Sequence, residues 1–255
     1  MTYKQRLLIA TTNPDKLREI RGILGRLPAE ILTLRDLAPV PEPEETRATF
    51  AENARLKALY YDAATGTGPD RDVGADLPAS ANVGSLCDPT SQHWLGGPRS
   101  RTAPAKLAKA PETRRRQVRP HYTVAEDSGL VIDALDGEPG VHSARFVRPD
   151  ASYPERFAEI YRRLDERPTR ARSARFVCAV AVAHQETVIY ETTGAIEGRI
   201  ADAPRGEGGF GYDPIFYYPP YGRTLGEVTE EDKLRVAHRG EAFRRLAIWL
   251  EKRKA

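Results

Sequence analysis

The sequence has little of what several protein classes require. Its two cysteines, Cys87 and Cys178, can form one disulfide at most, and neither has a partner at metal-ligand spacing, which excludes a disulfide scaffold. No apolar run approaches the roughly 20 residues that a membrane-spanning helix needs. The amino-terminal stretch lacks the apolar core and cleavage site of a secretory signal. These absences predict a cytoplasmic protein with no membrane partner.

The chain also lacks a strong net charge, and the charge it has is unevenly placed. Its 255 residues carry a formal net charge of +3 at pH 7. Residues 67–122 hold nine Lys or Arg against five Asp or Glu, an excess of four positive charges, so the rest of the chain is nearly neutral. This removes most of the electrostatic argument for a nucleic-acid-binding core. Such a role would depend on the basic cluster 114–119, and we expect no nucleic acid to be required.

The same segment has no sustained hydrophobic periodicity. It is rich in Gly, Pro, Ser, Asp and Arg, a composition that cannot bury enough apolar surface to offset the entropy of ordering. We therefore expect residues 67–122 to be a disordered or loosely folded insertion, which interrupts a single domain spanning residues 1–255.

Before this insertion, the pattern predicts a strand followed by two helices. Leu7–Ala10 is typical of a buried strand, and Asn13 then offers a helix N-cap with a proline directly behind it. The acidic stretch 42–46 is flanked by proline and predicts a loop. Thr49 and Glu52 form a capping box that begins the second helix.

After the insertion, strands again alternate with helices. The run TVAEDSGLVIDAL predicts two short strands around an EDSG turn, and apolar residues at helical spacing follow at 157–164. Residues 174–184 and 187–196 are rich in β-branched and aromatic residues and predict a strand pair. A final helix has apolar residues on one face up to Leu250. The alternation predicts an α/β fold.

Two adjacent carboxylates interrupt an apolar run at the EDSG segment. Buried carboxylates are costly unless they bind a partner, and a hard cation with oxygen ligands suits Glu126 and Asp127. Neighbouring residues of a strand point to opposite faces, so both reach one ion only if the backbone turns. Ser128 and Gly129 favour such a turn. The alternative is a surface turn without a ligand.

Three other segments suit a phosphorylated ligand. Residues 11–16 place Lys16 at a helix N-terminus, which attracts anions, although an ordinary capped junction looks the same. The run GEGGFG at 206–211 matches the dinucleotide fingerprint, but the prolines and aromatics behind it forbid the helix that this fingerprint must open. Its glycines instead allow close approach of a ligand, with Phe210 or Tyr212 stacking on a base, or they form a plain β-turn. Residues 233–239 bring together Lys, His and Arg donors that could bind a nucleotide. The alternative is a charged, solvent-exposed helix face.

Taken in order, ATTNPDK, EETxxTFxENAxxKA, EDSG, PGxxSAR, GGFGYDP and EDKxxxAHR resemble the motifs of the inosine triphosphate pyrophosphatase family. The resemblance spans about Leu7 to Leu250 apart from the insertion. It implies a mixed long central β-sheet flanked by helices, in two lobes with a nucleotide cleft between them, usually as a homodimer. It also implies Mg²⁺-dependent hydrolysis of non-standard purine nucleotides (ITP, dITP, XTP) to the monophosphate and pyrophosphate.

The resemblance assigns roles to individual residues. Asp127 matches the residue that binds metal and accepts a proton. Glu45, Glu126 and Asp127 are the expected Mg²⁺ ligands. The expected substrate contacts form a phosphate loop, a serine, a base-binding segment and a carboxy-terminal cluster: Thr11, Thr12, Asn13, Pro14, Asp15, Lys16, Ser128, Phe210, Gly211, Tyr212, Asp213, Lys233, His238 and Arg239.

The chain departs from the family pattern at two positions. Thr12 stands where many members have Gly, so the phosphate loop approaches its ligand less closely. Ala237 replaces a Ser before the His-Arg pair, which removes an N-cap worth about 1 kcal/mol. A rival interpretation is a Maf-like pyrophosphatase of the same broad fold that acts on modified pyrimidine nucleotides.

Overall fold

The computed structural model describes residues 5–25, 27–66, 119–169 and 171–253, so the predicted insertion lies outside the described residues up to residue 118. The helices are α1 (Pro14–Leu24), α2 (Phe50–Thr65), α3 (Tyr153–Asp165), α4 (Glu230–Val236) and α5 (His238–Lys252). The strands are β1 (Gln5–Ile9), β2 (Ala29–Thr33), β3 (Tyr122–Ile132), β4 (Ser173–His184), β5 (Thr187–Ile200), β6 (Phe216–Tyr218) and β7 (Arg223–Thr224).

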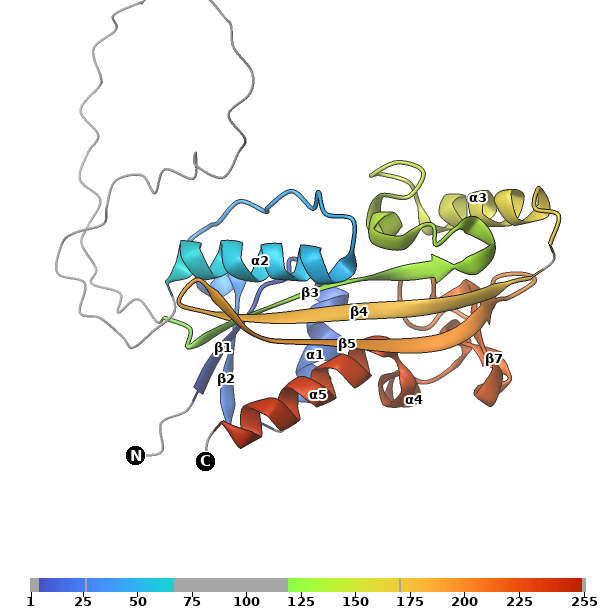
Figure 1. Ribbon diagram of the computed structural model, residues 1–255. Coiled ribbons are helices and arrows are strands. Elements are labelled where there is room, and N and C mark those ends of the chain that lie inside the picture. The colour runs from blue at the N-terminus through green and yellow to red at the C-terminus, as the bar shows by residue number, and fades with distance from the viewer. Residues whose placement is uncertain (1–4, 26, 67–118, 170, 254–255) are drawn as a thin grey trace, which may run out of the picture. The chain divides into compact units, whose positions relative to one another are not determined.

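The strands form one mixed sheet in the order β2-β1-β3-β4-β5-β6-β7. β1 pairs in parallel with β2 and with β3, and every later pairing is antiparallel. Figure 1 shows α2 on one side of this sheet and α1 with α5 on the other. The predicted mixed sheet flanked by helices is therefore confirmed.

The sequence of β4 explains why different helices cover the two faces. Side chains alternate across a strand, so Cys178, Val180 and Val182 share one face and the intervening alanines share the other. The larger side chains pack with apolar residues of α1 and α5, such as Ile20 and Phe243. The alanines lie in a cluster with Ala54, Ala58 and Tyr61 of α2, where small side chains let the helix approach the sheet closely.

The predicted EDSG turn is wrong. β3 runs without interruption and pairs with β4 from Thr123 to Ile132, because that ladder satisfies the backbone hydrogen bonds that a turn would leave open. Gly129 serves close packing instead, since a Cβ atom there would overlap the Ser143 hydroxyl. β3 also begins at Tyr122, a residue that the sequence pattern had placed in the insertion.

One edge of β3 is uncovered where the site lies. β1 pairs only with residues 122–124, and the Ala10 N–H then donates to the Val124 carbonyl at 2.8 Å. Further along this edge the Leu130 N–H donates to Ser143 Oγ at 2.9 Å, away from β1. The stretch between them, which holds Glu126 and Asp127, is therefore not paired with β1.

Most predicted local signals are confirmed. Asn13 Oδ1 accepts from the N–H groups of Asp15 and Lys16, and the capping box at the start of α2 is present. A short 3-10 turn and β6, rather than an α-helix, follow the glycine-rich run. Ala237 gives α5 no side-chain cap. In the described part of the chain, no helix has the length and apolarity to cross a membrane.

Candidate active site

Glu126 and Asp127 point to opposite faces of β3, because they are neighbours on a continuous strand. Both carboxylates are buried, and each is 4% exposed. Each carboxylate contacts a different set of side chains, although the charges on the two faces still act on one another.

Asp127 faces α2. Its Oδ2 accepts from the Asn53 amide at 3.0 Å, and its Oδ1 lies 3.4 Å from Lys57 Nζ. The same ammonium lies 2.8 Å from Glu45 Oε1. Lys57 therefore holds two carboxylates near one point.

Glu45 has a second cation, and Asp127 does not. Arg145 NH1 lies 3.3 Å from Glu45 Oε2, and its NH2 donates to the Glu45 carbonyl at 2.9 Å. Burial raises the pKa of Asp127, and the Lys57 ammonium offsets this only in part. Asp127 is thus a carboxylate with too little positive charge around it, a property of proton acceptors and metal ligands.

Glu126 faces α1 and α5. Its Oε1 lies 2.6 Å from Lys16 Nζ, and its Oε2 lies 3.5 Å from Arg239 NH2 and 3.2 Å from Cys178 Sγ. Burial alone would raise the pKa of Glu126, but the positive charges of Lys16, Arg239 and Lys57 hold it well below its usual value. Glu126 is therefore a fully ionised counter-ion.

A second buried carboxylate, Glu19 of α1, extends this network. It lies 2.7 Å from Lys233 Nζ and 2.5 Å from Arg239 NH1 through its two oxygens. Lys233 also contacts Asp213 at 2.5 Å, and Arg239 NH2 donates to Ser128 Oγ at 2.8 Å. Lys233 and Arg239 are 3% and 2% exposed, so both are fixed in place.

The glycine-rich segment closes over these cations. Lys233 Nζ lies 4.5 Å from the centre of the Phe210 ring, and Asp213 Oδ2 accepts from the Phe210 N–H at 2.7 Å. This bond requires a glycine at 209, which has φ +71°, because a Cβ atom there would overlap the Asp213 carboxylate. Tyr212 is 4% exposed and donates to the Ser143 carbonyl, so it is a wall of the site. Phe210 is the ring left for a base.

His238 begins α5 with its ring stacked on Phe176, 4.9 Å between centres. Burial and the nearby positive charges hold the pKa of His238 well below its usual value, so the ring is neutral. Its Nδ1 is buried without a hydrogen-bond partner among the described residues. α5 reaches this place because Gly194 of β5 has no side chain, and a Cβ atom there would overlap the His238 carbonyl.

The predicted phosphate loop, residues 11–16, lies at the end of β1. Thr11 Oγ1 accepts from the Asn13 N–H at 3.2 Å, and Thr12 Oγ1 donates to Glu42 at 3.4 Å. Asp15 pairs with Arg18 at 2.6 Å on the surface. Because Asn13 caps the first N–H groups of α1, Lys16 is the group in this loop best placed to receive a phosphate.

One pocket joins most of the predicted substrate contacts. Its lining includes the predicted residues Asn13, Lys16, Ser128, Phe210, Gly211, Tyr212, Asp213, Lys233, His238 and Arg239. Glu45 and Asp127 lie outside the lining, on the α2 side. Of the three predicted metal ligands, Glu45 and Asp127 thus lie on the face of β3 opposite to the pocket, whereas Glu126 lies on the face of the pocket cations.

Sequence reasoning gave no role to four residues of these networks. Asn53 and Lys57 stand within ENAxxKA, and Arg145 stands within PGxxSAR, so both motifs had been noticed without their side chains being assigned. Glu19 lies in the middle of α1 and outside every motif. A buried carboxylate in an otherwise amphipathic helix was the available signal, because such a group needs a cation.

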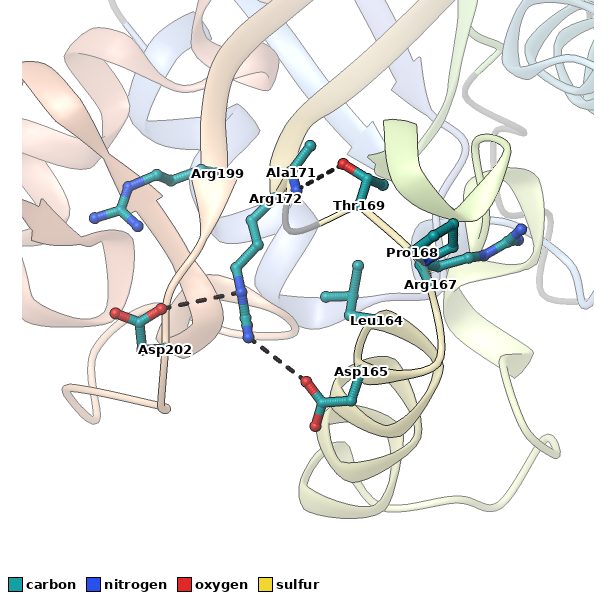
Figure 2. A pocket seen from close by; sticks show the side chains of 9 residues that line it. All are labelled: Leu164, Asp165, Arg167, Pro168, Thr169, Ala171, Arg172, Arg199 and Asp202. Carbon is teal, nitrogen blue, oxygen red and sulfur yellow. Dashed lines mark hydrogen bonds and ion pairs between the residues drawn. The ribbon is translucent and has the colours of Figure 1, made fainter.

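A larger hollow of about 710 Å³ lies elsewhere, at the end of α3. Figure 2 shows the Arg172 guanidinium between Asp165 and Asp202, at 3.8 and 4.0 Å. Its described lining contains none of the predicted site residues. Arg172 is paired with both carboxylates of the described lining, and we assign this hollow no role in catalysis.

Comparison with known proteins places these motifs in a family. The chain matches the model of the Ham1 family over residues 7–76 and 100–249. It is 37% identical over 242 residues to a dITP/XTP pyrophosphatase of Geobacillus kaustophilus, covering 94% of this chain and 91% of the relative. It is 36% identical over 246 residues to one of Thermus thermophilus, covering 96% and 92%.

Solved structures agree. A HAM1 protein from Coxiella burnetii superposes with a TM-score of 0.72 at 29% identity, covering 97% of this chain and 99% of that one. A nucleoside-triphosphatase, dITP/XTP pyrophosphatase, from Mycobacterium abscessus gives 0.61 at 30% identity, covering 95% and 98%. With the sheet, the motifs and their placement in agreement, the chain belongs to the Ham1 family.

Proposed function

We propose that this protein is a Mg²⁺-dependent nucleoside triphosphate pyrophosphatase that hydrolyses ITP, dITP and XTP to the monophosphate and pyrophosphate. The observation that carries the proposal is the pairing of two sites across β3: a carboxylate centre at Asp127 and a cation-lined pocket at Lys16, Lys233 and Arg239. The names of the related proteins, dITP/XTP pyrophosphatase, support the substrate class.

The residues on the α2 face fit a magnesium ion. Mg²⁺ prefers oxygen ligands and is usually bound by one or two carboxylates together with substrate phosphates. Glu45 and Asp127 converge on the Lys57 ammonium, which marks a place where positive charge is stabilised. The described ranges contain no group of three or more His, Cys, Asp or Glu side chains that could hold a metal ion by themselves, so the phosphates would have to complete the shell. Glu45 and Asp127 would hold the ion.

The chain's own groups divide the work of hydrolysis. When bound, Mg²⁺ supplies charge neutralisation for the phosphates. Asp127 accepts a proton from the water that attacks the α-phosphorus, since its carboxylate is buried beside the place where the metal and the phosphates would meet. A water–phosphorus bond forms, the bond to the β-phosphate oxygen breaks, and pyrophosphate leaves. Lys16, the most exposed of the pocket cations, contacts the phosphates while Glu126 holds it in place.

Base selection rests on donors in the pocket. His238 and Arg239 donate to a 6-keto oxygen, and a 6-amino group would leave these buried donors unpaired. ATP is therefore a poor substrate. We also propose that the protein acts in the cytoplasm as a homodimer, with the domain divided into two lobes and interrupted by the insertion; gel filtration with light scattering tests the dimer.

The test is pyrophosphate release from ITP, XTP, GTP, ATP, dUTP and TTP with Mg²⁺. The proposal requires ITP and XTP to exceed ATP by at least about a hundredfold in kcat/KM, the discrimination a missing buried hydrogen bond can supply. Preference for the pyrimidine nucleotides would favour the Maf-like alternative. A salt-dependent gel shift that disappears without residues 67–122 would favour the nucleic-acid alternative.

A further inference from the structure

We propose that Glu126 and Cys178 form a buried positioning pair: the Cys178 thiol orients the Glu126 carboxylate, which holds Lys16 and Arg239 in place for the substrate. Glu126 is then no metal ligand. The inference rests on the proposed function, because it concerns the same pocket.

The first argument is the set of partners around the Glu126 carboxylate. Its Oε2 accepts a hydrogen bond from the Cys178 thiol at 3.2 Å and lies 3.5 Å from Arg239 NH2. Its Oε1 lies 2.6 Å from Lys16 Nζ, an ion pair without hydrogen-bond geometry. In the described chain, the contacts of this buried carboxylate are thus two cations and a thiol, as for a counter-ion.

The second argument is its side of the sheet. The Glu45 and Lys57 side chains meet Asp127 on the α2 face, whereas Glu126 points to the α1 and α5 face. An ion held by Glu45 and Asp127 would therefore lie on the face of β3 opposite to the one where Glu126 makes its contacts. The distance to the cations Lys16 and Arg239, by contrast, is that of direct contact.

The third argument is the place of Cys178. It pairs with Ser128 across the β3–β4 ladder, so its side chain lies on the face of Glu126 and Ser128. It is fully buried, and its Sγ–H points at an ionised oxygen. Burial and the Glu126 charge raise the pKa of the thiol, so it stays protonated and remains a donor. Its apolar neighbours on the same face, Val124, Val180 and Val182, have no side-chain hydrogen-bond donor. Cys178 therefore supplies the donor in this cluster.

The experiment on Glu126 compares Glu126→Gln with Asp127→Asn in two measurements. The first is the Mg²⁺ concentration at half-maximal ITP hydrolysis, and the second is binding of inosine 5′-monophosphate without metal, by calorimetry. We expect Glu126→Gln to weaken monophosphate binding at least about tenfold, the effect of a lost charged hydrogen bond, with the Mg²⁺ midpoint unchanged. Asp127→Asn should do the reverse.

A Mg²⁺ midpoint raised tenfold in Glu126→Gln, with monophosphate binding intact, would overturn the inference and restore Glu126 as a ligand. Glu126→Asp keeps the charge and covers the case in which the glutamine variant misfolds; it should retain the wild-type Mg²⁺ midpoint. Wild-type protein that fails to hydrolyse ITP would instead defeat the proposed function.

The experiment on Cys178 compares Ser, Ala and Val at this position. Ser keeps a donor, Ala removes it and leaves space, and Val removes it at similar volume. We expect the KM for ITP to stay within about twofold for Ser and to rise about threefold to tenfold for Ala and Val, with kcat little changed, because a thiol is a weak donor. Equal KM values for all three, or a loss confined to Ala, would show that the thiol only fills space.

Discussion

The two faces of β3 both hold buried ion pairs, but the distances within these ion pairs differ. On the α1 and α5 face, the contacts of Glu19 and Asp213 with their cations measure 2.5–2.7 Å. On the α2 face, Lys57 lies 2.8 Å from Glu45 but 3.4 Å from Asp127, and Arg145 lies 3.3 Å from Glu45. The first face is a closed ion network, whereas Asp127 on the second face has a more distant cation.

The difference indicates a division of labour. A closed network of buried ion pairs is costly to rearrange, so it fixes the donors that recognise a substrate. Looser carboxylates can rearrange around a cation and a water molecule. One strand supplies both, because its alternation sends consecutive acids to opposite sides.

The largest effect is expected at the looser face. Asp127→Asn keeps the volume of the side chain but removes the base and the ligand charge, so kcat for ITP should fall at least about a thousandfold. Thermal unfolding should change little. Asp133→Asn, just beyond the end of β3 and exposed, is the control. Activity within tenfold of wild type would show that the chemistry lies elsewhere.

On the α1 and α5 face, removing a cation should lower the free energy of unfolding, because the ion pairs there are short and buried. Lys233→Ala leaves Glu19 and Asp213 buried without their shared cation, a loss of about 3–5 kcal/mol in unfolding free energy. Lys16→Ala takes the nearest cation from the buried Glu126, but Arg239 still contacts that carboxylate, so the loss of stability should be smaller. Both should raise the KM for ITP, as each loses a charged hydrogen bond of about 1.5–3 kcal/mol. Urea unfolding separates the two, and equal destabilisation would contradict the comparison.

Glu45 tests whether the looser face binds metal. Glu45→Gln should raise the Mg²⁺ concentration at half-maximal activity by about tenfold to a hundredfold, and excess Mg²⁺ should restore much of kcat. The matched control is Glu44→Gln, its exposed neighbour. An unchanged titration would mean that Glu45 only pairs with Lys57 and Arg145.

Acid should affect the closed face through His238. Its pKa is depressed in the folded state, so below about 6.5 the unfolded chain binds a proton that the folded chain does not. Stability is then present above that pH and falls as pH decreases, by up to about 1.4 kcal/mol per pH unit. Urea unfolding from pH 7 to 5 should show a shallower slope in His238→Gln than in His142→Gln, which changes an exposed histidine. Equal slopes would contradict this.

The smallest effect is expected from the insertion. Gly66 and Arg119, which flank residues 67–118, lie close together: a Cβ atom on Gly66 would be 3.4 Å from the Arg119 guanidinium. The ion pairs described above on both faces are formed by residues outside this segment, so replacing residues 67–118 by a short Gly-Pro linker should keep kcat/KM for ITP within about threefold. A markedly higher KM with normal folding would show that the segment contributes to phosphate binding.

Sequence reasoning succeeded where local chemistry decides structure. The caps at Asn13 and Thr49, the strand pair 174–184 and 187–196 and the sheet class are confirmed, and so is the family, by several motifs in a fixed order. It was wrong at EDSG, because β4 extends the ladder through Ser128 and Gly129 and tertiary pairing outweighs turn propensity.

The roles of the residues within the site stay predictions, because they also depend on tertiary contacts that the local sequence does not show. Periodicity shows that Glu126 and Asp127 alternate, but the partners of each come from α1, α2 and α5, which are distant in sequence. Glu19 carries no motif, and only the folded chain brings it to Lys233 and Arg239. Ion networks of this kind depend on tertiary packing.

Gly194 lies far from β3 in sequence, yet its missing side chain determines where α5 begins. The first turn of that helix rests directly on the backbone of β5, and the Ala195 N–H donates to Glu241 at 3.0 Å beside it. The placement of His238 and Arg239 is thus a contact between two main chains, independent of any rotamer. In a saturation mutagenesis screen, this position should tolerate substitution as poorly as Asp127. Substitutions of Gly194 would then inactivate the protein by displacing α5, although a glycine supplies no catalytic group.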